Sequence, residues 1–215
     1  DLSLVALIYS GLLRKDMDGN LVPDLASDYK ISENGLSYTF TLKDNLVFQD
    51  GKPLTADDVI FTIDKIKESG IENPNKARWN GINAEKIGEK TIQFVLKNPY
   101  PSFLENATLG ILPAHLWNNS PLELSSANTN PIGSGPYMVS SADKQPSGIV
   151  NHYRLAPFKK FILGRPYIKN LDLYFYQNED SLVEGLTNKE VDQINSITPA
   201  NADILKGKNF SVKSA

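Results

Sequence analysis

The side chains that most often hold metals or act as nucleophiles are scarce in this sequence. Its 215 residues contain no cysteine, which excludes disulfides, a catalytic thiol and thiolate metal sites within them. The two histidines, His115 and His152, are far apart, and neither belongs to an H-x-x-x-H or H-x-H pair. Because hydrolytic zinc sites need such clustered ligands, we predict no metal site and no cofactor.

Two acidic motifs resemble functional ones. Asp57 and Asp58 could form an acid pair, but a position at a helix start accounts for both, since carboxylates are stabilised there. Residues 16–20, Asp-Met-Asp-Gly-Asn, resemble the beginning of a calcium loop, yet the later ligands of an EF-hand are missing. A hairpin turn is therefore the favoured interpretation of this segment.

The run Gly-Ser-Gly-Pro at residues 133–136 could be mistaken for a phosphate-binding loop. It lacks the Lys-Ser/Thr ending of such a loop, and its proline removes a backbone donor. Ser134 also lacks the G-x-S-x-G pattern of a nucleophile elbow. We interpret the run as a tight turn into a strand, and we predict that the chain is not an enzyme.

The overall composition is that of an ordinary globular protein. Forty per cent of the residues are apolar and 22% are charged, with a net charge of −3. This charge and the lack of a basic cluster argue against a nucleic-acid partner. No run approaches the roughly 20 apolar residues that a membrane helix needs.

Residues 37–70 carry the clearest structural pattern. Apolar and polar side chains alternate over 37–43, which indicates a strand with one buried face. Asp-Gly-Lys-Pro at 50–53 predicts a turn. A helix follows, with Thr55 as the N-cap, Asp58 completing a capping box and Gly70 as the stop.

The rest of the chain alternates between helical and strand patterns. We therefore predict an α/β fold with a mixed β-sheet and flanking helices. Further helices are expected at the N-terminus (to about residue 9), from Phe103, from Pro113 as the first helical residue, over 178–187 and over 199–205. Further strands are expected as a short pair within 12–23 and at 28–33, 82–87, 91–97, 137–142, 149–155, 171–177 (buried on both faces or central in its sheet), 191–194 and 210–213. A loop is expected at 118–131.

Three segments carry a family resemblance. They are LVPDLASDYKISENGLSYTFTLK at 21–43, FQDGKPLTADDVIFT at 48–62 and NPIGSGPYMV at 130–139. Together and in this order, they are similar to the signature regions of the family 5 extracellular solute-binding proteins, the peptide- and nickel-binding components of ABC importers. The three matches extend over most of the chain but specify no ligand.

The resemblance implies an architecture. Family members have two lobes around a ligand cleft and are about twice as long as this chain. We therefore expect residues 1–215 to form most of lobe I of a periplasmic-binding-protein-like fold, without the first strand and the second lobe. A β-rich subdomain is expected within it at about 28–145.

The resemblance also implies which residues line the cleft. Tyr9 and Ser10 lie at a helix-to-strand junction that relatives use for this purpose. Thr108, Leu109 and Gly110 correspond to a segment that faces the ligand, and nickel-binding members carry an arginine at the position of Leu109. Trp79 corresponds to a cleft tryptophan of nickel-binding relatives, with packing in the core as an equal alternative.

The function implied is capture of oligopeptides and their delivery to the membrane permease subunits of an ABC transporter. The alternatives are a nickel-chelate or oligosaccharide receptor of the same family, a peptide-sensing lipoprotein and, least favoured, a hydrolase. A periplasmic or extracellular location follows from the resemblance, with a lipid anchor as an option. We expect a monomer without a nucleic-acid partner.

Overall fold

The computed structural model describes residues 2–68, 74–118 and 125–213. They form two compact units. One unit comprises Asp1–Asp143 and Tyr153–Leu173, and the other comprises Lys144–His152 and Tyr174–Ala215. The α/β class is confirmed, although the strands form three sheets rather than one.

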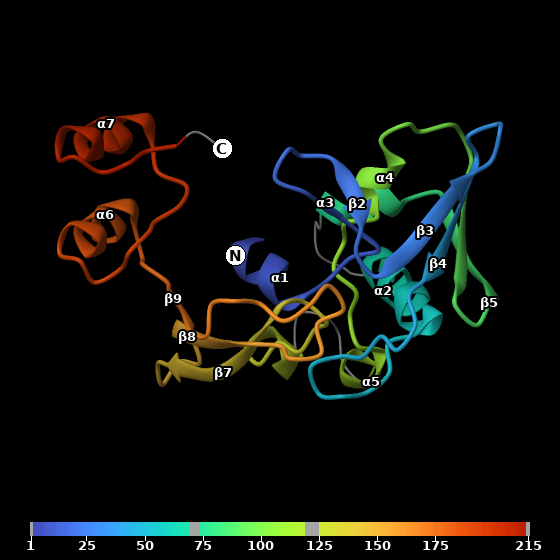
Figure 1. Cartoon of the computed structure of the whole chain (residues 1–215), viewed down its shortest axis with the longest axis horizontal. Helices are drawn as coiled ribbons and strands as arrows, with labels where there is room; N and C mark the ends of the chain where they lie inside the picture. Colours follow the sequence, from blue (N-terminus) through green and yellow to red (C-terminus); the bar gives the residue numbers. More distant parts are fainter. Residues whose placement is uncertain (1, 69–73, 119–124, 214–215) are drawn as a thin grey trace. The chain divides into compact units, whose positions relative to one another are not determined.

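The largest sheet has four antiparallel strands in the order β3-β4-β6-β5 (Figure 1). Its strands are β3 (Ala26–Ile31), β4 (Ser37–Leu42), β5 (Ile82–Gly88) and β6 (Thr91–Leu96). In β4 and β6 every second residue is buried, and Phe40 lies opposite Ile92. The alternation in the sequence thus predicted the face that the sheet buries, because successive side chains of a strand point to opposite faces.

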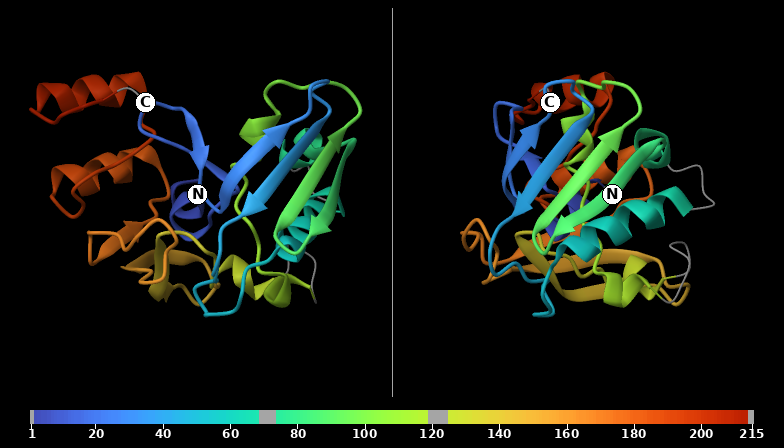
Figure 2. Two further views of the ribbon diagram at one scale, coloured as in Figure 1. Left: turned by 45° about the vertical axis from the view of Figure 1, so that its right-hand side comes forward. Right: turned by 90° about the vertical axis from the view of Figure 1, so that its right-hand side faces the viewer.

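Helix α2 (Ala56–Glu68) packs against this sheet, and Figure 2 shows it crossing one face. Its buried apolar side chains, Val59, Ile63 and Ile66, recur at three- and four-residue spacing and join the same core as Phe40 and Phe94. Three short helices pack nearby: α3 (Pro74–Trp79), α4 (Phe103–Asn106) and α5 (Ala114–Trp117).

The buried carboxylate of Asp58 stabilises the start of α2. Its Oδ2 accepts hydrogen bonds from the N–H of Thr55 at 2.9 Å and from the Thr55 hydroxyl at 3.1 Å. Its Oδ1 accepts from the N–H of Ala114 at 3.1 Å, so one side chain caps two helices. We predicted Pro113 as the first helical residue of α5, but it is the N-cap of that helix. The expected stop of α2 at Gly70 lies outside the described residues.

The N-terminal segment forms helix α1 (Leu2–Ile8) and a two-stranded sheet of β1 (Leu13–Lys15) and β2 (Leu21–Pro23). In the turn between these strands, Oδ1 of Asp16 accepts from the N–H groups of Asp18 and Asn20, both at 2.9 Å. The hairpin interpretation is confirmed. In the described part of the chain, no cluster of three His, Cys, Asp or Glu side chains could hold a metal ion.

The third sheet has the order β7 (Tyr137–Lys144), β8 (Val150–Pro157), β9 (Leu171–Tyr174). Helices α6 (Glu179–Thr187) and α7 (Pro199–Gly207) follow it, and each has a side-chain cap. Asn178 accepts from the N–H of Ser181 at 2.8 Å, and Thr198 caps α7. A short 3-10 helix (Ser126–Asn128) lies in the predicted 118–131 loop, of which residues 119–124 are outside the described part.

Three strand predictions in the C-terminal part are wrong. Strand β9 ends at Tyr174, which is exposed, and it lies at the edge of its sheet, so it is neither buried on both faces nor central. Residues 191–194 and 210–213 form no strand. Neither segment pairs with another described strand, and a β-strand forms only where a neighbour accepts its backbone hydrogen bonds.

Candidate functional site

The predicted junction after α1 lies directly beside the segment that follows α4. The N–H of Ile111 donates to the carbonyl of Ser10 at 2.9 Å, and the N–H of Leu13 donates to that of Ala107 at 3.0 Å. A Cβ placed on Gly110 would lie 2.6 Å from the Cβ of Tyr9, so only glycine permits this contact. The structure therefore brings together five of the six predicted residues: Tyr9, Ser10, Thr108, Leu109 and Gly110.

Tyr9 sits between two glycine-containing segments. On one side it touches Gly110, and on the other a Cβ added to Gly133 would lie 2.8 Å from its Cδ1. Burial of most of the phenol, with the nearby Tyr153 as a smaller cause, raises the pKa of Tyr9 well above its ordinary value. Its hydroxyl is thus neutral at physiological pH and can donate or accept a hydrogen bond.

Gln49 connects this junction to two of the segments that carry the family resemblance. Its Oε1 accepts from the N–H of Gly133 at 3.0 Å, and its Nε2 donates to the carbonyl of Tyr137 at 2.6 Å. The same Nε2 approaches the carbonyls of Ile8 (3.2 Å) and Gly135 (3.3 Å). One side chain therefore joins the end of α1, the 48–62 segment and the Gly-Ser-Gly-Pro turn. The role of this turn is structural, as predicted.

Main-chain groups at the junction remain available. In the described part of the chain, the N–H of Gly110 and the carbonyl of Leu109 make no hydrogen bond, and both residues are partly exposed. The flanking N–H groups of Leu109 and Ile111 are used internally, at 3.1 and 2.9 Å. A free donor and a free acceptor on adjacent residues can pair with the main chain of an extended ligand.

Trp79 does not belong to this surface. Only 2% of it is exposed, and its ring packs 5.4 Å from that of Phe94 and 5.7 Å from that of Phe103. It lies in the core with Leu109 and Ile111 around a small internal space. Of the two alternatives for Trp79, the structure supports packing in the core and not a place in the cleft, because the rings of Phe94 and Phe103 pack against it.

At this junction Ser10 contributes its carbonyl, which accepts from the N–H of Ile111. Its side chain is buried beside the carboxylate of Asp24, and among the described residues neither its Oγ nor Oδ1 of Asp24 has a hydrogen-bond partner of regular geometry. Burial raises the pKa of Asp24, while the proximity of Ser10, Lys43 and Arg14 opposes that rise.

The two histidines make separate contacts, one in each unit. His115 Nε2 lies 2.6 Å from Oδ2 of Asp50. Burial acts to raise the pKa of Asp50, but hydrogen bonds from His115 and from the N–H of Lys52 outweigh it and leave the pKa below its ordinary value. His152 stacks on Tyr174, with ring centroids 4.3 Å apart.

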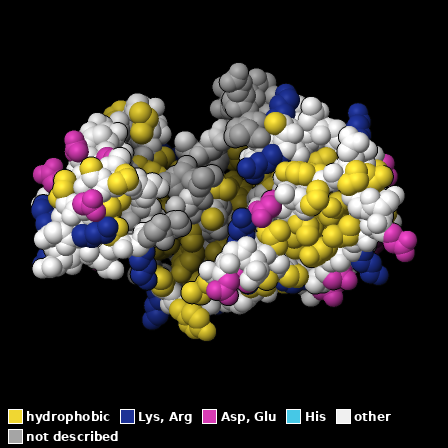
Figure 3. Space-filling model, turned by 90° about the horizontal axis from the view of Figure 1, so that it is seen from above, with side chains coloured by type: hydrophobic (Ala, Val, Ile, Leu, Met, Phe, Trp, Pro, Cys, Tyr) yellow, Lys and Arg dark blue, Asp and Glu magenta, His cyan; other side chains and the backbone are white. Residues whose placement is uncertain are grey.

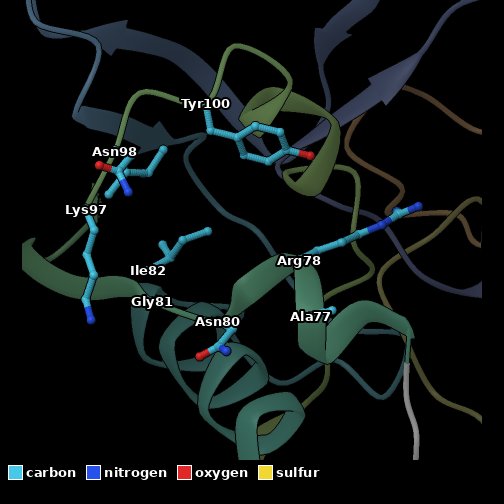
Figure 4. A pocket seen from close by; sticks show the side chains of 9 residues that line it. Ala77, Arg78, Asn80, Gly81, Ile82, Lys97, Asn98 and Tyr100 are labelled. Carbon is cyan, nitrogen blue, oxygen red and sulfur yellow. The ribbon is translucent and has the colours of Figure 1, made fainter.

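A separate hollow of about 470 Å³ was not anticipated from the sequence (Figure 4). The hollow lies on the unit that carries the four-stranded sheet. Figure 3 shows hydrophobic side chains gathered on the surface of that unit, with charged side chains of both signs around them. The hollow is lined by Ala77, Arg78, Asn80, Gly81, Ile82, Leu96, Lys97, Asn98 and Tyr100. Little in the sequence indicated this hollow, because its two cations, Arg78 and Lys97, are 19 positions apart and belong to different elements.

Comparison with known proteins decides the family. Residues 20–214 match the model of the bacterial extracellular solute-binding proteins, family 5. The chain belongs to this family. Two of its three signature segments, 48–62 and 130–139, meet at Gln49.

Individual relatives agree with this assignment. The oligopeptide-binding protein AppA of Bacillus subtilis is 29% identical over 88% of this chain. Its solved structure, in complex with a nonapeptide, aligns over 89% of the chain with a TM-score of 0.77 and 28% identity. NikZ of Campylobacter jejuni, solved with Ni(L-His), aligns over 86% with a TM-score of 0.75 and 31% identity. The chain spans 35–39% of these proteins' length.

Proposed function

We propose that the chain is the ligand-capturing part of an extracytoplasmic receptor that binds oligopeptides and delivers them to the permease of an ABC importer. Membership of a solute-binding family supports transport rather than catalysis. Similarity to an oligopeptide-binding protein, over most of this chain, supports a peptide ligand. On this proposal the ligand leaves the protein chemically unchanged.

The observation that carries the peptide assignment is the pair of available main-chain groups at Leu109 and Gly110. A peptide offers a carbonyl and an N–H at every residue, so these two groups can bind it whatever its side chains are. Tyr9 lies against Gly110 and adds an apolar ring with a neutral hydroxyl. Such a surface suits a receptor that accepts peptides of many sequences.

A nickel chelate is the second candidate, because a similar structure was solved with Ni(L-His). The residue that the family resemblance aligns with the arginine of nickel-binding members is Leu109 here. An uncharged side chain at this point cannot pair with the carboxylate of such a chelate, which favours the peptide.

Membership of a family of extracellular solute-binding proteins supports a site of action outside the cytoplasm, and we propose the periplasm or the cell surface. No helix in the described part of the chain is long and apolar enough to cross a membrane. We propose that attachment to the membrane, where it exists, is through a lipid anchor. The permease subunits are the partners that this function requires.

Native mass spectrometry of the full-length protein, purified without denaturation, tests the proposal. We expect intact peptides of mixed sequence to be released from the protein. Their recovery without hydrolysis after prolonged incubation would separate a receptor from a hydrolase. Release of a nickel complex or an oligosaccharide would instead overturn the peptide assignment.

A further inference from the structure

The hollow beside α3 has the size of a binding site and shares no residue with the Tyr9–Gly110 surface. Its volume of about 470 Å³ lies within the range of about 300–1,000 Å³ found for small-ligand sites. The lining comes from the end of α3, the start of β5, and the end of β6 with the loop after it. These elements all lie in one unit.

The charged residues of this hollow are both cations. Arg78 and Lys97 line it, and none of its nine lining residues is acidic, in a chain whose net charge is −3. Within the described residues, neither side chain forms an ion pair or a hydrogen bond. Asn80 and Asn98 add carboxamide groups. The hollow therefore presents donors that an anionic ligand can use.

The backbone around the hollow is held in place by the core. The carbonyl of Arg78 accepts from Nδ2 of the buried Asn106 at 3.0 Å. The carbonyl of Tyr100 accepts from the N–H of Phe103 at 2.9 Å and from the Tyr38 hydroxyl at 3.3 Å. A site whose backbone is fixed in this way loses little freedom when it binds.

The arrangement of the side chains limits the shape of the ligand. Figure 4 shows Arg78 and Lys97 on opposite sides, with Ile82 and the ring of Tyr100 between them. Ile82 is buried, whereas 41% of Tyr100 is exposed. A ligand that meets both cations must carry two separated carboxylates joined by a body that can cover an apolar side chain and an aromatic ring.

We propose that this hollow docks an extended, acidic peptide segment of a partner protein. A small-molecule site encloses 70–90% or more of its ligand, whereas this hollow is open and its polar lining residues are exposed. A segment that remains part of a larger protein needs no such enclosure. This docking site is independent of the proposed capture of oligopeptides and would persist if the captured ligand were another solute.

Nuclear magnetic resonance of the 15N-labelled chain tests the proposal. The probe is a blocked pentapeptide, acetyl-Glu-Gly-Leu-Gly-Glu-amide, and its matched control has glutamine in place of both glutamates. We expect saturable shifts of the Asn80, Gly81 and Asn98 signals with the acidic peptide only. Added salt should weaken binding, because these exposed charges are screened.

Three variants locate the binding. Arg78→Gln and Lys97→Gln should each weaken the affinity by up to about fivefold, the upper end for exposed ion pairs. Lys30→Gln removes another exposed cation, on β3, and should change nothing. Unchanged spectra outside the hollow would show that the variants are folded.

Several outcomes would overturn the proposal. One is equal binding of the glutamine peptide, and another is a set of shifts confined to Tyr9 and residues 108–110. Full affinity in both hollow variants would also contradict it. Glutarate that saturates the same signals at equal or lower concentration would identify a free dicarboxylate as the ligand and rule out a peptide segment.

Discussion

Gln49 holds three segments together, and its replacement should loosen all of them. Gln49→Ala removes the acceptor for the N–H of Gly133 and the donor to the carbonyl of Tyr137, both on buried residues. Each buried group left unpaired costs about 1–3 kcal/mol. The carbonyl of Ile8 retains its hydrogen bond from the N–H of Gly135 at 2.8 Å, so it adds little. Because Gln49 is partly exposed, water can reach the site, and we expect a loss of about 2–4 kcal/mol.

Gln49→Glu separates the hydrogen-bonding role from packing. Glutamate has nearly the same size and still accepts from Gly133, but when ionised it has no donor for the carbonyl of Tyr137. At pH 7 we therefore expect this variant to be at least as unstable as the alanine variant. Below the pKa of the new carboxyl group, its proton can serve as the donor, so the loss relative to wild type should shrink.

Urea unfolding followed by the fluorescence of the buried Trp79 and Trp117 measures these differences. The matched control is Gln93→Ala, which removes one contact of 3.3 Å to Thr39 and should cost no more than about 0.5 kcal/mol. A Gln49→Glu variant as stable as wild type at pH 7 would refute the assigned donor role. So would a Gln49→Ala variant no less stable than the Gln93 control.

Three further substitutions test other parts of the structure. Asp58→Ala leaves two N–H groups at the starts of α2 and α5 without their acceptor and should cost about 2–4 kcal/mol in urea unfolding. Asp57→Ala removes only an exposed ion pair with Lys86 at the same helix start and should cost about 1 kcal/mol or less. Gly110→Ala introduces a contact of 2.6 Å with Tyr9 and should lower the unfolding free energy by about 1–3 kcal/mol. Gly207→Ala, where an added Cβ has no atom within 4 Å, should not lower it. Equal effects of the two substitutions would contradict the close packing of Gly110 against Tyr9. Burial raises the folded-state pKa of Asp24 above its unfolded value near 3.9, so the wild type should lose stability relative to Asp24→Asn as the pH rises from about 3.9 through the folded-state pKa. If the difference in urea midpoint between wild type and Asp24→Asn were the same at pH 3.5 and at pH 7, the predicted loss of wild-type stability with rising pH would be contradicted.

Local patterns predicted much of the fold. The alternation in β4 and the Thr55–Asp58 capping signal located a strand and a helix, because both depend on residues close in sequence. The strand predictions at 191–194 and 210–213 failed because strand formation depends on a partner elsewhere in the chain.

The site was less predictable for a related reason. The contacts of Gln49 join residues 41 to 88 positions apart, which no local pattern reports. The apolar character of Trp79 is equally compatible with a cleft and a core, and only the positions of Phe94 and Phe103 decide between them. Family resemblance located Tyr9 and Gly110, but the close contact between them became visible only in the structure.

A crystal structure of the full-length protein with its co-purifying ligand tests the proposed function most directly. We predict an extended peptide with a carbonyl oxygen about 3 Å from the N–H of Gly110 and an N–H directed at the carbonyl of Leu109. A ligand bound elsewhere, or one that leaves both main-chain groups unpaired, would contradict the proposal.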